Sequence, residues 1–118
     1  MIFEVTIPEK VSMNDIYSGM HWKKRRDLAD LFHNEFLELK GKIKVIKYPV
    51  VIHYDWHFKR NALDSLNCAF MSKMLEDGMV HVGILEDDSP KYVAESRLKS
   101  QKTDIYQHDT VVISIEEV

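Results

Sequence analysis

The stretch KVIKYPVVIHYDWHF, residues 44–58, decides the fold class because it is typical of a β-strand with two different faces. From residue 50 onward the side chains alternate between apolar and largely polar types. The apolar face carries Val50, Ile52, Tyr54, Trp56 and Phe58, and the other face carries Val51, His53, Asp55 and His57. The pattern predicts one strand over 44–58, broken or bulged near Pro49, with one face against a core.

Two helical patterns flank this strand. From about Met20 to Lys40 apolar residues recur three and four positions apart, and Gly41 is a suitable helix terminator. A second helix is expected over roughly 64–79, with an apolar side that includes Leu63, Leu66 and Phe70. The two tryptophans, Trp22 and Trp56, are assigned to the core.

Three further strands complete the expected architecture. Residues 2–7 alternate and end at Pro8, residues 91–101 and 110–116 are also β-type, and residues 11–19 are expected to be irregular. The order β-α-β-α-β-β favours an α/β (α+β) fold with a mixed four-stranded sheet flanked by two helices. The 118 residues fit one domain, residues 1–118.

Composition excludes several classes of protein. Hydrophobic residues make up 45% and charged residues 30%, as in ordinary globular domains. The single cysteine, Cys68, excludes an internal disulfide and a cysteine-based zinc cluster. No apolar run approaches the roughly 18 residues of a membrane-spanning helix, and the N-terminus does not resemble a signal peptide. We therefore expect a cytoplasmic protein with no membrane partner.

Charge is distributed unevenly although the net charge is only −3. Basic residues are contiguous at Lys23, Lys24, Arg25 and Arg26 and pair again at Lys59 and Arg60. Such clusters are either solvated surface or sites of phosphate contact, and the pattern alone leaves both open.

Acidic residues concentrate in GILEDDSPKYV, residues 83–93, where Glu86, Asp87 and Asp88 are consecutive. Adjacent carboxylates repel each other, so they form either a solvated turn or part of a divalent cation site. Three segments are candidates to meet in space: RNALDSLN at 60–67, the helix with Lys73 and Asp77, and the acidic turn. Asp77 lies near the helix C-terminus, where a negative charge is unfavourable, so we expect it to have a local partner.

The stretch KMLEDGMVHVGILEDDSPKYV, residues 73–93, resembles the signature of RusA-type Holliday junction resolvases of bacteria and prophages. That signature has a lysine, a helix ending in Asp-Gly and a turn containing two aspartates and Ser-Pro-Lys-Tyr-Val. The family also has an Asp-x-Asp-Asn motif whose asparagine lies six residues before the lysine. In this chain Asp64, Leu66 and Asn67 align with the first aspartate, the second aspartate and the asparagine of that motif. The opening IPEKVSMNDIYSGMHWKKRR, residues 7–26, also resembles that family.

The resemblance implies a homodimeric endodeoxyribonuclease that resolves four-way DNA junctions in recombination and repair with Mg²⁺ or Mn²⁺. It implies Asp64, Asp87 and Asp88 as catalytic metal ligands and Lys73 as a catalytic residue that stabilises phosphate charge. The implied DNA-binding residues are Lys23, Lys24, Arg25, Arg26, Lys59, Arg60 and Asn67.

One departure from the family pattern concerns Leu66, which stands where the family has its second aspartate. Asp64 joins the site only if it precedes or caps the helix, and Leu66 is either a lost ligand position or a core residue. A rival register places Asp64 on the second aspartate and Cys68 where some relatives have lysine. Three interpretations stay open: an active nuclease, a catalytically degenerate DNA-binding protein, and an interaction domain with merely surface acids.

Overall fold

The computed structural model describes residues 1–118 and places strand β2 (Val50–Phe58) inside a four-stranded sheet of order β1-β4-β2-β3. Strand β2 pairs antiparallel with β4 (Thr110–Glu117) and parallel with β3 (Val93–Lys102). Strand β1 (Ile2–Thr6) pairs antiparallel with β4 at the edge of the sheet. The expected mixed four-stranded α+β fold is confirmed.

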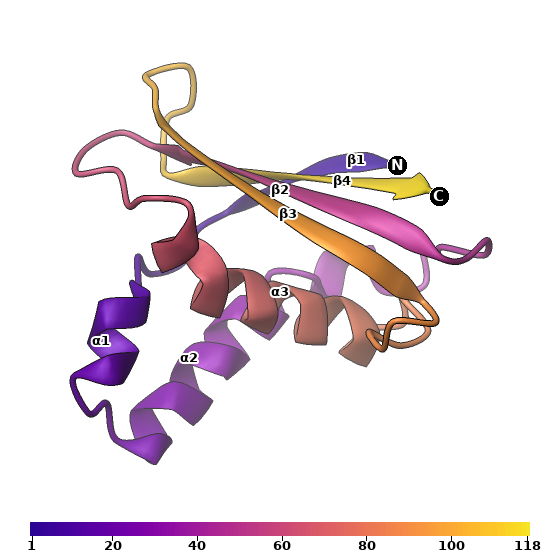
Figure 1. Ribbon diagram of the computed structural model, residues 1–118, viewed down its shortest axis with the longest axis horizontal. Coiled ribbons are helices and arrows are strands. Elements are labelled where there is room, and N and C mark those ends of the chain that lie inside the picture. Colours follow the sequence, from indigo (N-terminus) through magenta and orange to yellow (C-terminus); the bar gives the residue numbers. More distant parts are fainter.

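Helix α3 (Ala69–His81) makes the crossover between the parallel strands β2 and β3, which no tight turn can join. A 3₁₀ turn, η2 (Leu66–Cys68), precedes it. Helix α2 (Trp22–Asn34) packs on α3. The helices lie on one face of the sheet and leave the opposite face bare (Figure 1).

The core lies between the sheet and helices α2 and α3. Ile52, Tyr54, Trp56 and Phe58 are all buried, so the apolar face expected for the central strand is confirmed. Trp22 was expected in the core, and this was wrong because its side chain is 61% exposed. The physical reason is its position: the buried residues of α2 are Leu28 and Phe32, so the first turn of the helix has no core to cover it.

Several element boundaries differ from those expected. Residues 11–19 are not irregular throughout, since α1 (Met13–Tyr17) begins there with Ser12 and Asp15 in a reciprocal capping box. The helix expected to reach Lys40 ends at Asn34, and a 3₁₀ turn, η1 (Leu37–Leu39), follows it.

The central strand begins at Val50 rather than at residue 44. Pro49 has no backbone N–H with which to continue a ladder. The backbone N–H of Val45 instead donates to the carbonyl of Ile84, 2.8 Å away, beyond the end of α3. None of the helices combines the length and the apolar composition needed to cross a membrane.

Candidate functional site

The ammonium of Lys73, on the exposed side of α3, binds two carboxylates at once. Nζ donates to Asp88 Oδ2 at 2.7 Å and lies 2.9 Å from Asp77 Oδ1, one helical turn further along. The hydrogen bond to Asp88, followed by that to Asp77, raises the pKa of Lys73. The same bond from Lys73 lowers the pKa of Asp88. Asp77 thus has the local partner expected for it, and Asp88 and Lys73 meet as the sequence predicted.

A third carboxylate, Glu76, joins this cluster from the same helix and was missed in the sequence. Its Oε1 accepts hydrogen bonds from the Tyr54 hydroxyl and from Ser96 Oγ, both at 2.9 Å. Burial, then the charge of Glu76, raises the pKa of Tyr54 well above its usual range, with further contributions from Asp77 and Asp88. The sequence did contain a signal for it: Glu76 follows Lys73 by three positions, and residues three apart on a helix are neighbours on its surface.

The acidic turn that carries Asp87 and Asp88 is anchored to the fold. The backbone N–H of Glu86 donates to the Tyr48 hydroxyl at 2.9 Å, and that hydroxyl donates to the carbonyl of Val45 at 3.0 Å. The carboxylate of Asp87 has no hydrogen bond or ion pair with the protein and is partly exposed. It is therefore available to a ligand beside the Lys73 cluster.

Asp64 lies in the segment between β2 and η2, well before the acidic turn in the chain. Its Oδ1 accepts a hydrogen bond from the backbone N–H of Asn67 at 2.9 Å, so Asp64 is bonded to η2, whose N-cap is Ser65. This leaves Oδ2 without a protein partner. Asp64, Leu66 and Asn67 line an open hollow of about 390 Å³ together with Met13 and Tyr17 of α1.

Leu66 is 78% exposed in this hollow. The alternative that it belongs to the apolar stripe of the helix is therefore wrong, because η2 precedes α3 and turns this side chain away from the sheet. Leu66 occupies surface beside Asp64 and lines the same hollow.

The structure keeps Asp64 apart from the acidic turn. Asp64 precedes the N-terminal end of α3 and the acidic turn follows its C-terminal end, so the length of the helix lies between them (Figure 1). No group of three histidine, cysteine, aspartate or glutamate side chains is placed to hold one metal ion. The assignment of Asp64, Asp87 and Asp88 to a single ion thus stays a prediction, while Asp77 and Asp88 are the carboxylates that converge on one cation.

Cys68 does not replace the lysine that the rival register would require. The thiol is buried, and burial raises its pKa to about 11, against an opposing hydrogen bond from Ser100. A neutral buried thiol cannot contact a phosphate.

The basic segment Lys23–Arg26 forms the exposed first turns of α2. Lys24 makes one weak ion pair, at 3.4 Å to Glu9, and Arg26 lies over the Trp22 ring with its Cζ 5.2 Å from the ring centroid. An exposed tryptophan beside four cations is a surface on which a nucleobase can stack. Sequence reasoning found the charges and missed the exposure of Trp22.

The second basic pair, Lys59 and Arg60, follows β2 and lines an open polar hollow of about 340 Å³ together with Lys10 and His108. Asp109 Oδ1 accepts a hydrogen bond from the backbone N–H of Lys59 at 2.8 Å, and Lys10 Nζ donates to the carbonyl of Arg60 at 3.1 Å. Lys10 is a cation of this hollow that the sequence did not single out.

Comparison with protein families gives no match to this chain. No curated protein matches it either. The resemblance to RusA-type resolvases therefore rests on the sequence motifs themselves.

Proposed function

We propose that this protein is a Mg²⁺-dependent endodeoxyribonuclease that cuts four-way DNA junctions in recombination and repair, in the cytoplasm of bacteria or of phage-infected cells. The observation that carries the proposal is the convergence of Asp77 and Asp88 on the Lys73 ammonium, with the unpartnered Asp87 beside them. An exposed cluster with more carboxylates than cations is suited to binding a second positive ion.

The donor set fits a hard divalent cation. Mg²⁺ takes oxygen ligands, keeps several waters and needs only one or two carboxylates in addition to substrate phosphate. Asp87 and Asp88 are the proposed ligands, and Mn²⁺ fits the same donors. A divalent ion held by these two carboxylates would supply Lewis acidity toward the scissile phosphate and the attacking water.

Lys73 has a separate role in the proposal. Its pKa is raised by Asp88 and Asp77, so the side chain stays cationic at neutral pH. This ammonium, beside the proposed ligand Asp88, would donate to a phosphate oxygen and stabilise the charge that builds during cleavage.

DNA binding is assigned to two basic surfaces. Lys23–Arg26 would neutralise phosphates while Trp22 stacks on an unpaired base, and Lys59 with Arg60 would hold a second stretch of backbone. Asn67 belongs to the hollow that contains Asp64, where a backbone phosphate is its proposed partner.

A second candidate is a DNA-binding protein without catalysis on the same fold. It is favoured by the exposed Leu66, which supplies no ligand beside Asp64, and by the backbone hydrogen bond that occupies one oxygen of Asp64. This candidate predicts junction binding without metal-dependent cleavage.

Cleavage of a synthetic four-way junction with and without Mg²⁺ separates the two. We expect metal-dependent cleavage by the natural chain, none by Asp88→Asn, and equal junction binding by both. Asp104→Asn, an exposed aspartate in the β3–β4 loop, is the matched control and should cut normally. Binding without cleavage at any Mg²⁺ or Mn²⁺ concentration would establish the non-catalytic alternative.

A further inference from the structure

The hollow that contains Lys59 and Arg60 lies where three connections meet at one end of the sheet (Figure 1). The segment after β1 contributes Lys10, the segment after β2 contributes the basic pair, and the β3–β4 loop contributes the remaining side chains, Gln107, His108 and Asp109. None of the six lining residues is hydrophobic. Pockets that hold organic molecules are lined mainly by apolar groups, so this hollow is suited to a small charged ligand.

Hydrogen bonds between these connections fix the walls of the hollow. The backbone N–H of Ile7, just after β1, donates to the carbonyl of Asp109 at 2.9 Å. Asp109 Oδ1 in turn accepts from the backbone N–H of Lys59 at 2.8 Å, so Asp109 joins all three connections. A site whose walls are formed in advance loses little conformational freedom when it binds a ligand.

The two lysines of the hollow are held in place by backbone carbonyls. Lys10 Nζ donates to the carbonyls of Arg60 and Asn61 at 3.1 and 3.2 Å. Lys59 Nζ donates to the carbonyl of Tyr106 at 3.1 Å. An ammonium has three N–H donors, so one remains on Lys10 and two remain on Lys59 for a ligand.

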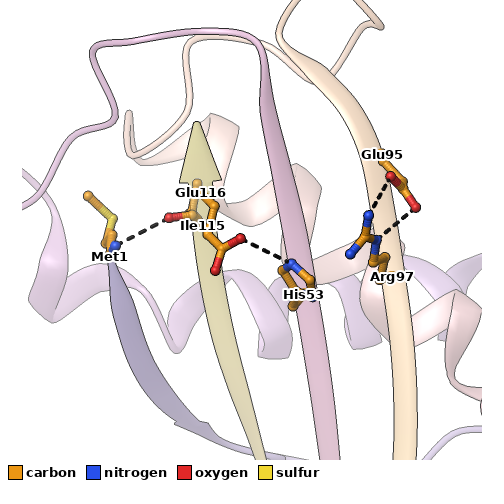
Figure 2. Close-up of polar contacts among 6 residues, drawn as sticks. All are labelled: Met1, His53, Glu95, Arg97, Ile115 and Glu116. Carbon is orange, nitrogen blue, oxygen red and sulfur yellow. Dashed lines mark hydrogen bonds and ion pairs between the residues drawn. The ribbon is translucent and has the colours of Figure 1, made fainter. Parts of the chain in front are cut away.

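Arg97 and Lys73 differ from these lysines because their partners are carboxylates. Arg97 donates to both oxygens of Glu95 at 2.8 and 3.1 Å (Figure 2), and Lys73 binds Asp77 and Asp88. A carboxylate partner cancels the charge of a cation, whereas a carbonyl partner leaves that charge in place. The lysines of the hollow are therefore both localised and fully charged.

The balance of charge in the hollow is positive. Three permanent cations, Lys10, Lys59 and Arg60, line it with one carboxylate, Asp109. The exposed His108 can add a fourth positive charge, because histidine side chains change charge between about pH 5 and pH 8. Such a wall attracts anions, and phosphate oxygens accept the hydrogen bonds that ammonium and guanidinium groups donate.

We propose that this hollow binds one phosphate group of a DNA backbone, with Lys10 and His108 as phosphate-binding residues beside Lys59 and Arg60. The proposal rests on the DNA binding of the proposed function and gives that binding a pH dependence. Protonation of His108 adds a positive charge to the wall formed with Lys10, Lys59, Arg60 and Asp109. Binding should therefore tighten as the pH falls through the range in which histidine titrates.

The position of the hollow favours DNA over a free phosphate ion as the source of this group. Glu9, which precedes Lys10, has its Oε2 3.4 Å from Nζ of Lys24 in the basic segment of α2. The two basic surfaces are therefore neighbours, and one backbone with repeated phosphates can contact both. A free phosphate ion gains only one of these contacts.

The test is fluorescence anisotropy of the full chain with a labelled DNA duplex that contains no junction, over a potassium chloride series at pH 8 and pH 6. At pH 8 we expect Lys10→Ala to raise the Kd at least about threefold and to lower the slope of log affinity against log salt by about 0.9, the value for one phosphate contact. Lys42→Ala removes the same charge from an exposed position in the segment before β2 and should change neither quantity.

A separate pair of variants tests His108. His108→Gln keeps a hydrogen-bond donor but cannot become charged, so we expect the same Kd as the natural chain at pH 8. Its affinity should rise less than that of the natural chain between pH 8 and pH 6. His81→Gln, at the exposed end of α3, is the control and should respond to pH as the natural chain does.

An unchanged salt slope in Lys10→Ala overturns the phosphate site, and an unchanged pH response in His108→Gln overturns the role of His108. Calorimetric titration with inorganic phosphate at constant ionic strength separates the two sources. Phosphate that binds the natural chain but not Lys10→Ala, while both bind DNA equally, overturns the DNA source. Junction cleavage is scored separately, so a chain that behaves as expected here and cuts no junction refutes only the nuclease activity of the proposed function.

Discussion

Asp88 illustrates at the scale of single residues how little an exposed ion pair contributes to stability. Its partner Lys73 is 60% exposed, so solvent screens the attraction and the pair is worth on the order of 0.2–1 kcal/mol. A lysine that holds two carboxylates at this exposure therefore contributes little to the stability of the fold.

The pKa of Asp88 gives that small contribution a definite pH dependence. Because the pKa of Asp88 is lowered in the folded protein, its carboxylate stabilises the fold at pH values above the ordinary pKa of about 3.9. This stabilisation is lost as the pH falls through the pKa of the folded state. We expect Asp88→Asn to reduce the free energy of unfolding by on the order of 0.2–1 kcal/mol at neutral pH and to have no effect in strong acid. Urea unfolding of both proteins at the two pH values measures this. A deficit that persisted in acid would show that packing, and not charge, is lost.

Leu66 offers a test of the departure from the family motif. Because its side chain is 78% exposed, Leu66→Asp buries no charge, and the free energy of unfolding should change by no more than about 0.5 kcal/mol. The new carboxylate lies beside Asp64 and not beside the proposed ligands Asp87 and Asp88, so we also expect the Mg²⁺ concentration needed for junction cleavage to stay the same. Urea unfolding and a Mg²⁺ titration of cleavage provide the two readouts. A lower Mg²⁺ requirement would show that the hollow of Asp64 belongs to the metal site.

At the scale of elements, the first turns of α2 extend past the core and expose Trp22 together with Lys23, Lys24, Arg25 and Arg26. Replacing the four cations by alanine keeps a good helix former at each position. We expect DNA affinity to fall broadly and the slope of log affinity against log salt to drop by about 0.9 for each lost phosphate contact. Fluorescence titration over a salt series measures both.

The matched control for that variant removes the same charge from another exposed segment: Lys40, Lys42, Lys44 and Lys47 to alanine. Its salt slope should equal that of the natural chain. If both variants lost the same slope, net charge alone would explain the binding, and the α2 surface would have no special role.

The contact between α2 and α3 depends on a missing side chain at Gly78. A Cβ there would lie 3.0 Å from ring atoms of both His33 and Phe36, which is too close for a carbon contact. We expect Gly78→Ala to destabilise the fold by about 1–3 kcal/mol, despite the better helix propensity of alanine. Thermal and urea unfolding check this. Phe36→Leu makes room, so the double variant should lose less than the sum of the two single losses; strict additivity would place the strain elsewhere.

At the scale of the whole molecule, one core joins the sheet to both long helices, and its buried residues come from all four strands, from α2 and α3 and from the segments that connect them. A single core of this kind predicts a single cooperative unfolding transition. In Trp22→Phe, which keeps only the fully buried Trp56, the fluorescence and far-UV circular dichroism transitions in urea should coincide. Separate midpoints would mean that the helical layer melts apart from the sheet.

The sequence alone was sufficient for the features that follow from local pattern. Alternation in residues 50–58 identified the buried face of the central strand, because side chains of a strand point to opposite faces whatever it pairs with. The order of strands and helices determined the fold class, and the charge of Asp77 near a helix end predicted a partner. The motif around Asp87 and Asp88 yielded the functional hypothesis, which awaits experiment.

Only the tertiary structure decided which residues lie together and which are exposed. Trp22 and Leu66 look apolar in sequence, yet both are exposed, because burial depends on whether another element lies over that turn. The separation of Asp64 from Asp88 has the same origin: both belong to one connection, but α3 runs between them. The strand order β1-β4-β2-β3 depends on pairings between strands that are far apart in the chain, and no local pattern encodes their register.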